Sequence, residues 1–123
     1  MKVDKDYEIN LTKLDSVREN LNGFWILAEN LGGESILWIK FEKEEYSTFW
    51  ETIPFTDEIQ KTKTLPWESC PTFIELTKVM DTVQINLISM GGKTQHKLNY
   101  MTKTKFIIDS TTYLRHKGYD FLN

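Results

Sequence analysis

The sequence predicts an all-β fold: an eight-stranded antiparallel up-and-down β-barrel with a short N-terminal helix. Three observations lead to this prediction. About eight segments show the apolar alternation of strands, and most of them are joined by short turns. No helical pattern lies between them, so the crossover connections that parallel strands require are missing. Several segments are apolar on both faces, which suits a filled barrel better than an open sheet.

The N-terminal part is expected to form an arm followed by one helix. Residues 1–10 are polar and predict a flexible arm. Apolar residues recur at helical spacing from Leu11 to Leu21, with Thr12 as the predicted cap and Asn22-Gly23 as the predicted end. A helix this short is marginal alone, so we expect it to dock on one end of the barrel.

The strand pattern begins at Gly23 and continues to Lys117, so the predicted barrel domain spans residues 11–117 with a C-terminal tail at 118–123. Pro54 is expected to end the third strand, and Gly91-Gly92 predicts a two-residue hairpin turn. The strands are predicted at 23–30, 34–42, 45–53, 58–64 (a polar edge strand), 72–79, 82–90, 93–101 and 106–117, the last being one strand or a bent pair.

Composition and charge exclude several classes of protein. With 123 residues, 40% of them hydrophobic and 13% aromatic, the chain is expected to be one folded domain. The net charge of −3 argues against a general nucleic-acid binder. Residues 1–75 carry a net −7 and residues 76–123 a net +4. This split either helps the two ends of the barrel pair or forms a basic face for an anionic partner.

The sequence contains no pattern that predicts a membrane span, a metal site or a cofactor. The longest apolar run, Phe24 to Ala28, is far shorter than the roughly 18 residues of a membrane-spanning helix. The first ten residues lack the apolar core of a signal peptide, although an exported mature domain would lack it too. One cysteine, Cys70, and two distant histidines give neither a disulfide nor a metal cluster.

One short motif resembles a known family. Gly23-Phe24-Trp25 follows the predicted helix at the start of the first strand, and Arg115 lies in the last strand. This order resembles the lipocalin-like (calycin) barrels, most closely the short bacterial lipocalin-like domains often found on exported or lipid-anchored proteins. The resemblance implies that Trp25 plugs the closed end of the barrel. It also implies that the Arg115 guanidinium lies over the indole and donates to backbone carbonyls.

The family pattern is incomplete in this chain. There is no disulfide, no long helix precedes the last strand, and the family's second and third motifs are not recognisable. The resemblance implies a non-enzymatic protein that binds a small hydrophobic ligand in the barrel. The alternative is a filled barrel that serves as a protein–protein interaction module. The candidate ligand-binding wall residues are Trp38, Phe41, Trp50, Phe73, Ile85, Leu87 and Tyr100.

No group in the sequence is predicted to be catalytic. His96 and His116 have no neighbouring acid along the sequence. Cys70 lies close to Glu68, and an acidic neighbour raises the pKa of a thiol, which opposes its activation as a nucleophile. Trp67 lies in a loop between two prolines and is expected to seal the core. We therefore expect a binding protein and not an enzyme.

Overall fold

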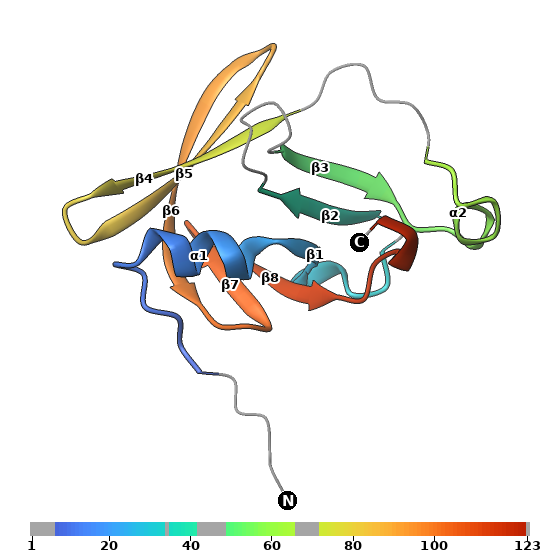
Figure 1. Cartoon of the computed structure of the whole chain (residues 1–123), viewed down its shortest axis with the longest axis horizontal. Helices are drawn as coiled ribbons and strands as arrows, with labels where there is room; N and C mark the ends of the chain where they lie inside the picture. Colours follow the sequence, from blue (N-terminus) through green and yellow to red (C-terminus); the bar gives the residue numbers. More distant parts are fainter. Residues whose placement is uncertain (1–6, 34, 42–48, 66–71, 123) are drawn as a thin grey trace, which may run out of the picture.

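Eight antiparallel strands close into a barrel, in which each strand pairs with its neighbours in sequence and β8 pairs with β1 (Figure 1). The computed structural model describes residues 7–33, 35–41, 49–65 and 72–122. The predicted fold class is therefore confirmed. The strands are β1 (Gly23–Leu27), β2 (Ser35–Lys40), β3 (Phe49–Pro54), β4 (Phe73–Val79), β5 (Thr82–Ser89), β6 (Gly92–Met101), β7 (Lys105–Ile108) and β8 (Thr111–His116).

The N-terminal helix α1 (Leu14–Leu21) packs against the barrel (Figure 1). Val17 and Leu21 are fully buried and belong to the same apolar cluster as Trp25. The helix starts three residues later than predicted. Thr12 does not cap it, because its backbone N–H and its hydroxyl both donate to the side chain of Asn10. We call this side of the barrel, formed by α1, Trp25 and Arg115, the closed end.

Arg115 closes this end through one aromatic ring and three carbonyls. Its guanidinium carbon lies 3.9 Å from the centroid of the Trp25 ring, so the contact predicted from the sequence is confirmed. The guanidinium donates to the backbone oxygens of Asn20 at 2.6 Å, Asn22 at 2.7 Å and Lys103 at 3.0 Å. It thus ties the end of α1 to the β6–β7 turn.

Gly23 makes room for this arrangement. Its φ of +130° is a conformation that other residues rarely adopt. A Cβ atom built on it would lie 2.6 Å from Nη1 of Arg115. The Trp25 indole N–H donates to the backbone oxygen of Leu21 at 2.8 Å, which fixes the ring under the helix. Glycine, tryptophan and arginine therefore act together in one corner of the fold.

The interior next to the closed end is filled with aromatic and aliphatic side chains. Phe106 contacts Trp25 edge to face at 4.6 Å between ring centroids and stacks on Tyr113 at 4.8 Å. Alternation on β5 points Val83 and Ile85 inward, as the sequence predicts. The buried members of this cluster are Val17, Leu21, Trp25, Leu37, Ile39, Ile74, Leu76, Val83, Ile85, Leu98, Met101, Phe106 and Ile108.

A second apolar cluster lies on the outer face of β1–β3, where the structure differs from the sequence prediction. The polar stretch around residues 58–64 is not an edge strand but part of helix α2 (Asp57–Thr62). The Thr56 hydroxyl caps this helix by accepting from the N–H of Ile59. The helix lets Ile59 pack beside Phe24, Ile36, Ile53 and Tyr119.

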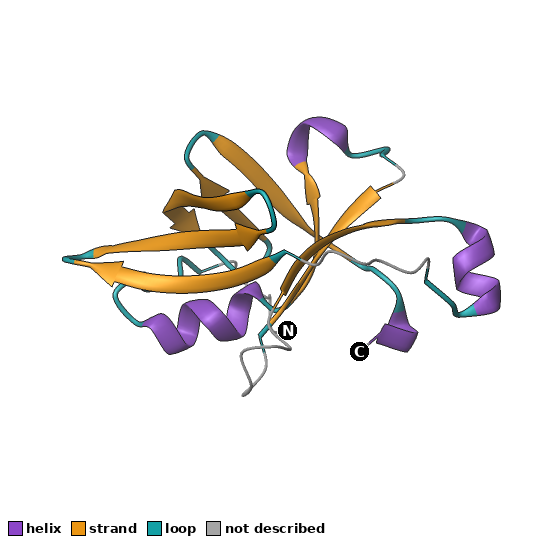
Figure 2. Ribbon diagram, turned by 90° about the horizontal axis from the view of Figure 1, so that it is seen from above, coloured by secondary structure: helices purple, strands orange, loops and turns teal. Residues whose placement is uncertain are grey.

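The C-terminal residues also differ from the tail that we expected. Tyr119 is 1% exposed, and its hydroxyl donates to Pro54 O at 2.6 Å and accepts from Thr56 N at 2.7 Å. A short 3₁₀ helix, Asp120–Leu122, follows it. This segment and α2 lie on the other side of the molecule from α1 (Figure 2). The loss of a predicted strand at 58–64 is balanced because the segment 106–117 forms two strands, β7 and β8.

The described part of the N-terminal arm is joined to the barrel by backbone contacts. Glu8 forms an isolated bridge with Thr102, and the N–H of Ile9 donates to Met101 O at 2.7 Å. The side chain of Ile9 packs against the core cluster. The arm predicted at residues 1–10 is therefore attached at positions 8 and 9.

Within the described residues, the ladder between β3 and β4 is the shortest in the barrel. Its one pair of facing residues is Phe49 with Phe73. The N–H of Trp50 donates to Thr72 O at 2.8 Å, and the N–H of Thr72 donates to a Glu51 carboxylate oxygen at 2.9 Å. From Phe73 onward β4 pairs with β5, and β5 pairs with β6 (Figure 1).

Candidate functional site

A cavity of about 410 Å³ lies between β3 and the β5–β6 hairpin. Its volume falls within the range of pockets that hold small organic molecules. Trp50 and Leu87 supply its apolar surface, and hydroxyl, carboxylate and backbone groups supply the rest. The lining residues are Trp50, Glu51, Thr52, Thr72, Leu87, Ser89, Gly92 and Thr94.

The register of the strands explains why these side chains meet. Leu87 faces Thr94 across the β5–β6 hairpin, on the same side of the sheet as the buried Ile85. Trp50 faces Ile39 on β2, which is also an interior position. Trp50 contacts Tyr113 edge to face at 5.8 Å, so its ring forms the boundary between the filled core and the cavity. The cavity is thus an open pocket at the edge of the barrel interior, with Trp50 and Leu87 on the side of the filled core.

Two of the seven predicted wall residues, Trp50 and Leu87, line this cavity. Ile85 is fully buried in the filled core, and Phe41 packs at the edge of the same cluster. Phe73 is 37% exposed, beside Phe49 in the short β3–β4 ladder. Trp50 and Leu87 therefore line the cavity, whereas Ile85, Phe41 and Phe73 belong to the core, to its edge or to the surface.

Trp38 and Tyr100 lie on the outer side of the barrel. Trp38 belongs to the outer cluster, where its ring stacks on Phe24 at 5.9 Å and meets Phe49 edge to face at 4.7 Å. Tyr100 would share the face of Leu98 if β6 were regular. An irregularity between the two residues shifts the register and places Met101, not Tyr100, in the core.

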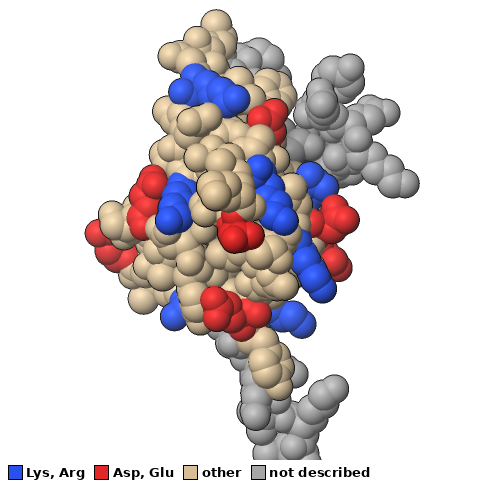
Figure 3. All heavy atoms as spheres, turned by 90° about the vertical axis from the view of Figure 1, so that its left-hand side faces the viewer, with Lys and Arg blue, Asp and Glu red and all other residues tan. Residues whose placement is uncertain are grey.

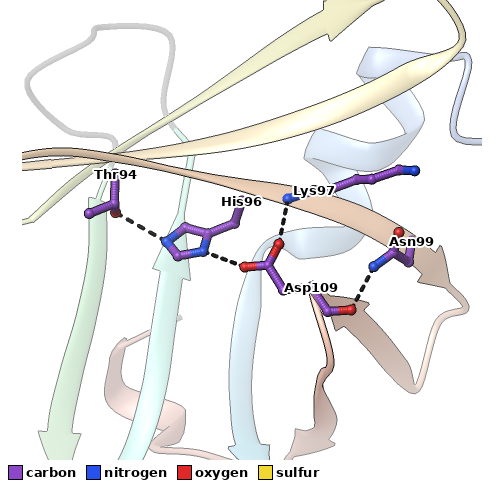
Figure 4. Close-up of polar contacts among 5 residues, drawn as sticks. All are labelled: Thr94, His96, Lys97, Asn99 and Asp109. Carbon is purple, nitrogen blue, oxygen red and sulfur yellow. Dashed lines mark hydrogen bonds and ion pairs between the residues drawn. The ribbon is translucent and has the colours of Figure 1, made fainter.

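A polar chain of three side chains adjoins the cavity and was not predicted. Thr94 and His96 project from the same side of β6 toward Asp109 at the end of β7 (Figure 4). The His96 Nδ1 atom is 2.8 Å from Asp109 Oδ2, and His96 Nε2 is 3.1 Å from Thr94 Oγ1. Thr94 is at the same time part of the cavity wall.

The backbone of β6 holds Asp109 in place. Asp109 has a positive φ of 51°, in the turn between β7 and β8. Its N–H donates to Lys97 O at 2.9 Å, its Oδ1 accepts from Lys97 N at 3.2 Å, and its carbonyl accepts from the Asn99 amide at 2.6 Å. The pKa of its carboxyl is lowered, first by the hydrogen bond to His96 and then by the Lys97 N–H. The carboxylate is therefore ionised at neutral pH.

Sequence reasoning missed this group because the acid is thirteen positions from the histidine and reaches it only through strand pairing. One signal was available: an aspartate in the turn between two adjacent strand patterns favours the left-handed backbone conformation. His116, the other candidate, has no comparable partner. Its Nδ1 accepts from Gly118 N at 3.0 Å, and burial lowers its pKa. Cys70 and Trp67 lie outside the described residues.

Basic and acidic side chains are interspersed on the face shown in Figure 3, where no patch of one sign dominates. Within the described ranges, no three His, Cys, Asp or Glu side chains gather in a geometry that could hold a metal ion. No helix in those ranges has the length and hydrophobicity needed to cross a membrane.

Comparisons with protein-family models, with curated proteins and with solved structures find no match to this chain.

Proposed function

We propose that this chain is a lipocalin-like barrel that binds a small, partly apolar molecule in the cavity between β3 and the β5–β6 hairpin. The observation that carries the proposal is the cavity itself, about 410 Å³ in volume with Trp50 and Leu87 on its wall. The lipocalin-like assignment is supported by the corner of Gly23, Trp25 and Arg115.

The composition of the cavity wall narrows the chemical class of the proposed ligand. Most lining residues are polar, and they surround a smaller apolar surface. A purely hydrocarbon ligand would leave these polar groups without partners, which costs free energy. A ligand with an apolar body and at least one hydrogen-bonding group fits this wall better than the fully hydrophobic ligand expected from the sequence.

Native mass spectrometry tests the proposal. Protein purified rapidly from cells should carry extra mass under native conditions, and this mass should disappear on denaturation and be recovered by organic extraction. Thr52→Trp adds a large ring at an exposed, cavity-lining position and should abolish the extra mass. Gln95→Trp, at an exposed position on the other side of β6, is the matched control and should retain it.

The opposite result would favour the protein-interaction alternative. If wild-type protein shows a bare mass, also after incubation with a panel of aryl alcohols, amines and acids, the cavity does not serve small molecules. If the extra mass persists in Thr52→Trp, a ligand is bound elsewhere.

A further inference from the structure

The polar chain of Thr94, His96 and Asp109 has the order of a nucleophile, a base and an orienting acid. A hydroxyl nucleophile needs a base within hydrogen-bond reach, and that base needs a third group to orient it. His96 Nε2 lies 3.1 Å from Thr94 Oγ1, and the other ring nitrogen, Nδ1, lies 2.8 Å from Asp109 Oδ2 (Figure 4). Both distances fall within the range that such an arrangement requires.

The carboxylate of Asp109 determines which nitrogen of the ring donates to it. A carboxylate only accepts hydrogen bonds, so His96 Nδ1 is the donor. In the neutral imidazole Nε2 then carries no proton, and it accepts from the Thr94 hydroxyl. Asp109 is itself held by hydrogen bonds to Lys97 and Asn99, so the ring is oriented from a fixed point.

The register of β6 places the hydroxyl end of this chain at the cavity. Thr94 and His96 lie opposite Leu87 and Ile85, on the inner face of the sheet. Thr94 forms part of the cavity wall. The side chain of His96 is 29% exposed, so water can reach it. The nucleophile therefore faces the ligand site, and its base is accessible to solvent.

The rest of the cavity wall suits a small ester. Trp50 and Leu87 offer apolar surface to the body of such a molecule. The indole N–H of Trp50 and the hydroxyls of Thr52 and Thr72 are hydrogen-bond donors of lining residues. Donors of this kind stabilise the oxyanion that forms when a nucleophile adds to a carbonyl group.

We propose that Thr94 is a nucleophile and that this barrel hydrolyses small esters with an apolar body. Thr94 and His96 are the catalytic residues, and Asp109 is a positioning residue that orients His96. The inference rests on the proposed function, because the ester binds in the same cavity. It goes beyond that function and differs from the non-enzymatic protein expected from the sequence.

The reaction passes through an acyl group on Thr94. Thr94 Oγ1 forms a bond to the ester carbonyl carbon, its proton moves to His96 Nε2, and the bond from that carbon to the alcohol oxygen breaks. His96 gives the proton to the departing alcohol. Water then loses a proton to His96 and attacks the acyl carbon, and Thr94 Oγ1 leaves and takes that proton back. The net reaction converts an ester and water into a carboxylic acid and an alcohol.

The substrate p-nitrophenyl acetate tests the inference on the full-length protein at neutral pH. Absorbance follows the release of p-nitrophenolate, and peptide mapping by mass spectrometry after an acid quench locates the acetyl group, which should lie on Thr94. Thr94→Val should lower kcat/KM at least about tenfold, whereas Thr94→Ser keeps a hydroxyl and should retain activity. Thr112→Val makes the same change on the outer side of β8 and should have no effect.

Substitutions of the two partner residues test their separate roles. His96→Gln removes the base and should abolish acetylation of Thr94, whereas the matched control His116→Gln should retain it. Asp109→Asn tolerates the left-handed backbone at this position. With its oxygen kept on the Lys97 N–H, the amide group would donate to His96 Nδ1 and reverse the tautomer. Its kcat should fall at least about tenfold while KM changes less than about twofold.

The outcomes distinguish this inference from the binding proposal. 2-Phenylethanol has a similar apolar body and no acyl group, so the amide shifts that it causes at Trp50, Leu87 and Thr94 of ¹⁵N-labelled protein report binding alone. If it shifts these residues but the wild type hydrolyses the ester no faster than Thr94→Val, the esterase inference is wrong and the binding proposal stands.

Two other results would also overturn the inference. One is acetylation of lysine side chains without acetylation of Thr94, and the other is an Asp109→Asn variant with the full kcat of the wild type. If 2-phenylethanol at about 10 mM leaves the cavity residues unshifted and hydrolysis does not depend on Thr94, both the esterase inference and the binding proposal are overturned.

Discussion

Replacing Arg115 should destabilise the barrel much more than replacing an exposed arginine, because Arg115 makes three hydrogen bonds and a ring contact at the closed end. Arg115→Met keeps the stem of the side chain and removes three hydrogen bonds to Asn20, Asn22 and Lys103, together with the contact 3.9 Å above Trp25. Each hydrogen bond contributes about 1 kcal/mol when discounted for partial exposure, and the cation–π contact about 1 kcal/mol.

The expected loss is therefore about 3–4 kcal/mol in the free energy of unfolding, or a fall in Tm of roughly 10 °C or more for a chain of this size. The assay is urea unfolding followed by tryptophan fluorescence and circular dichroism, which gives the midpoint and slope separately. Arg18→Met is the matched control. Arg18 is 45% exposed at its side chain and pairs with a fully exposed Asp15, so its loss should cost under about 0.5 kcal/mol.

Equal losses for Arg115→Met and Arg18→Met would refute this reasoning, as would a loss below about 1 kcal/mol for Arg115→Met. Either result would mean that solvent replaces the guanidinium without penalty. The closed end would then be held by apolar packing alone, and the Arg115 contact would no longer support the lipocalin-like assignment.

Three further predictions concern stability. Burial lowers the pKa of His116, and protonation would also break the hydrogen bond that its Nδ1 accepts from Gly118 N. The folded state should therefore lose stability as the pH drops below about 6.5. His116→Gln should flatten the dependence of Tm on pH in this range. The pKa of Asp109 is lowered chiefly by its hydrogen bond to His96, so its contribution to the free energy of unfolding should be lost as the pH falls below about 3.8. Asp109→Asn should reduce this acid sensitivity, as measured by urea unfolding at a series of pH values. Phe106→Ala should cost about 3–5 kcal/mol in the same assay, because the side chain is fully buried; a cost under 1 kcal/mol would contradict the packing account.

The features that could be read from the sequence depend on local pattern. Alternation on β5 identifies Val83, Ile85 and Leu87 as one inward face because a regular strand repeats every two residues. The contact of Arg115 with Trp25 was expected from the resemblance to lipocalin-like barrels and not from local pattern, and the structure contains it. These residues predict how the barrel is built, but they do not predict where its cavity lies.

The features that could not be read depend on contacts between distant segments. Helix α2 replaces the predicted edge strand because the Thr56 cap and the burial of Ile59 outweigh a weak local pattern. The irregularity in β6 lies at Asn99 and moves Tyr100 off the inner face, whereas alternation along the sequence predicts a regular strand there. The pair of His96 and Asp109 exists only because β6 and β7 lie side by side.

The cavity depends on a similar non-local cause. Trp50 and Leu87 were predicted on the wall, but the cavity forms only where β3 meets the β5–β6 hairpin in the closed barrel. Sequence alternation predicts which side chains face inward, whereas the position of a cavity depends on which distant segments approach each other. The polar part of the wall, above all Thr94, was missed for the same reason.

Fluorine NMR of protein labelled with 5-fluorotryptophan tests the central claim most directly, because the described tryptophans occupy three different environments. Trp50 lines the cavity, Trp25 is buried at the closed end, and Trp38 lies on the outer face. With signals assigned by Trp→Phe variants, titration with 2-phenylethylamine and 2-phenylethanol should shift the Trp50 resonance and leave the other two unchanged. A silent Trp50, or a shift confined to Trp38, would contradict the proposal that this barrel binds small molecules in its cavity.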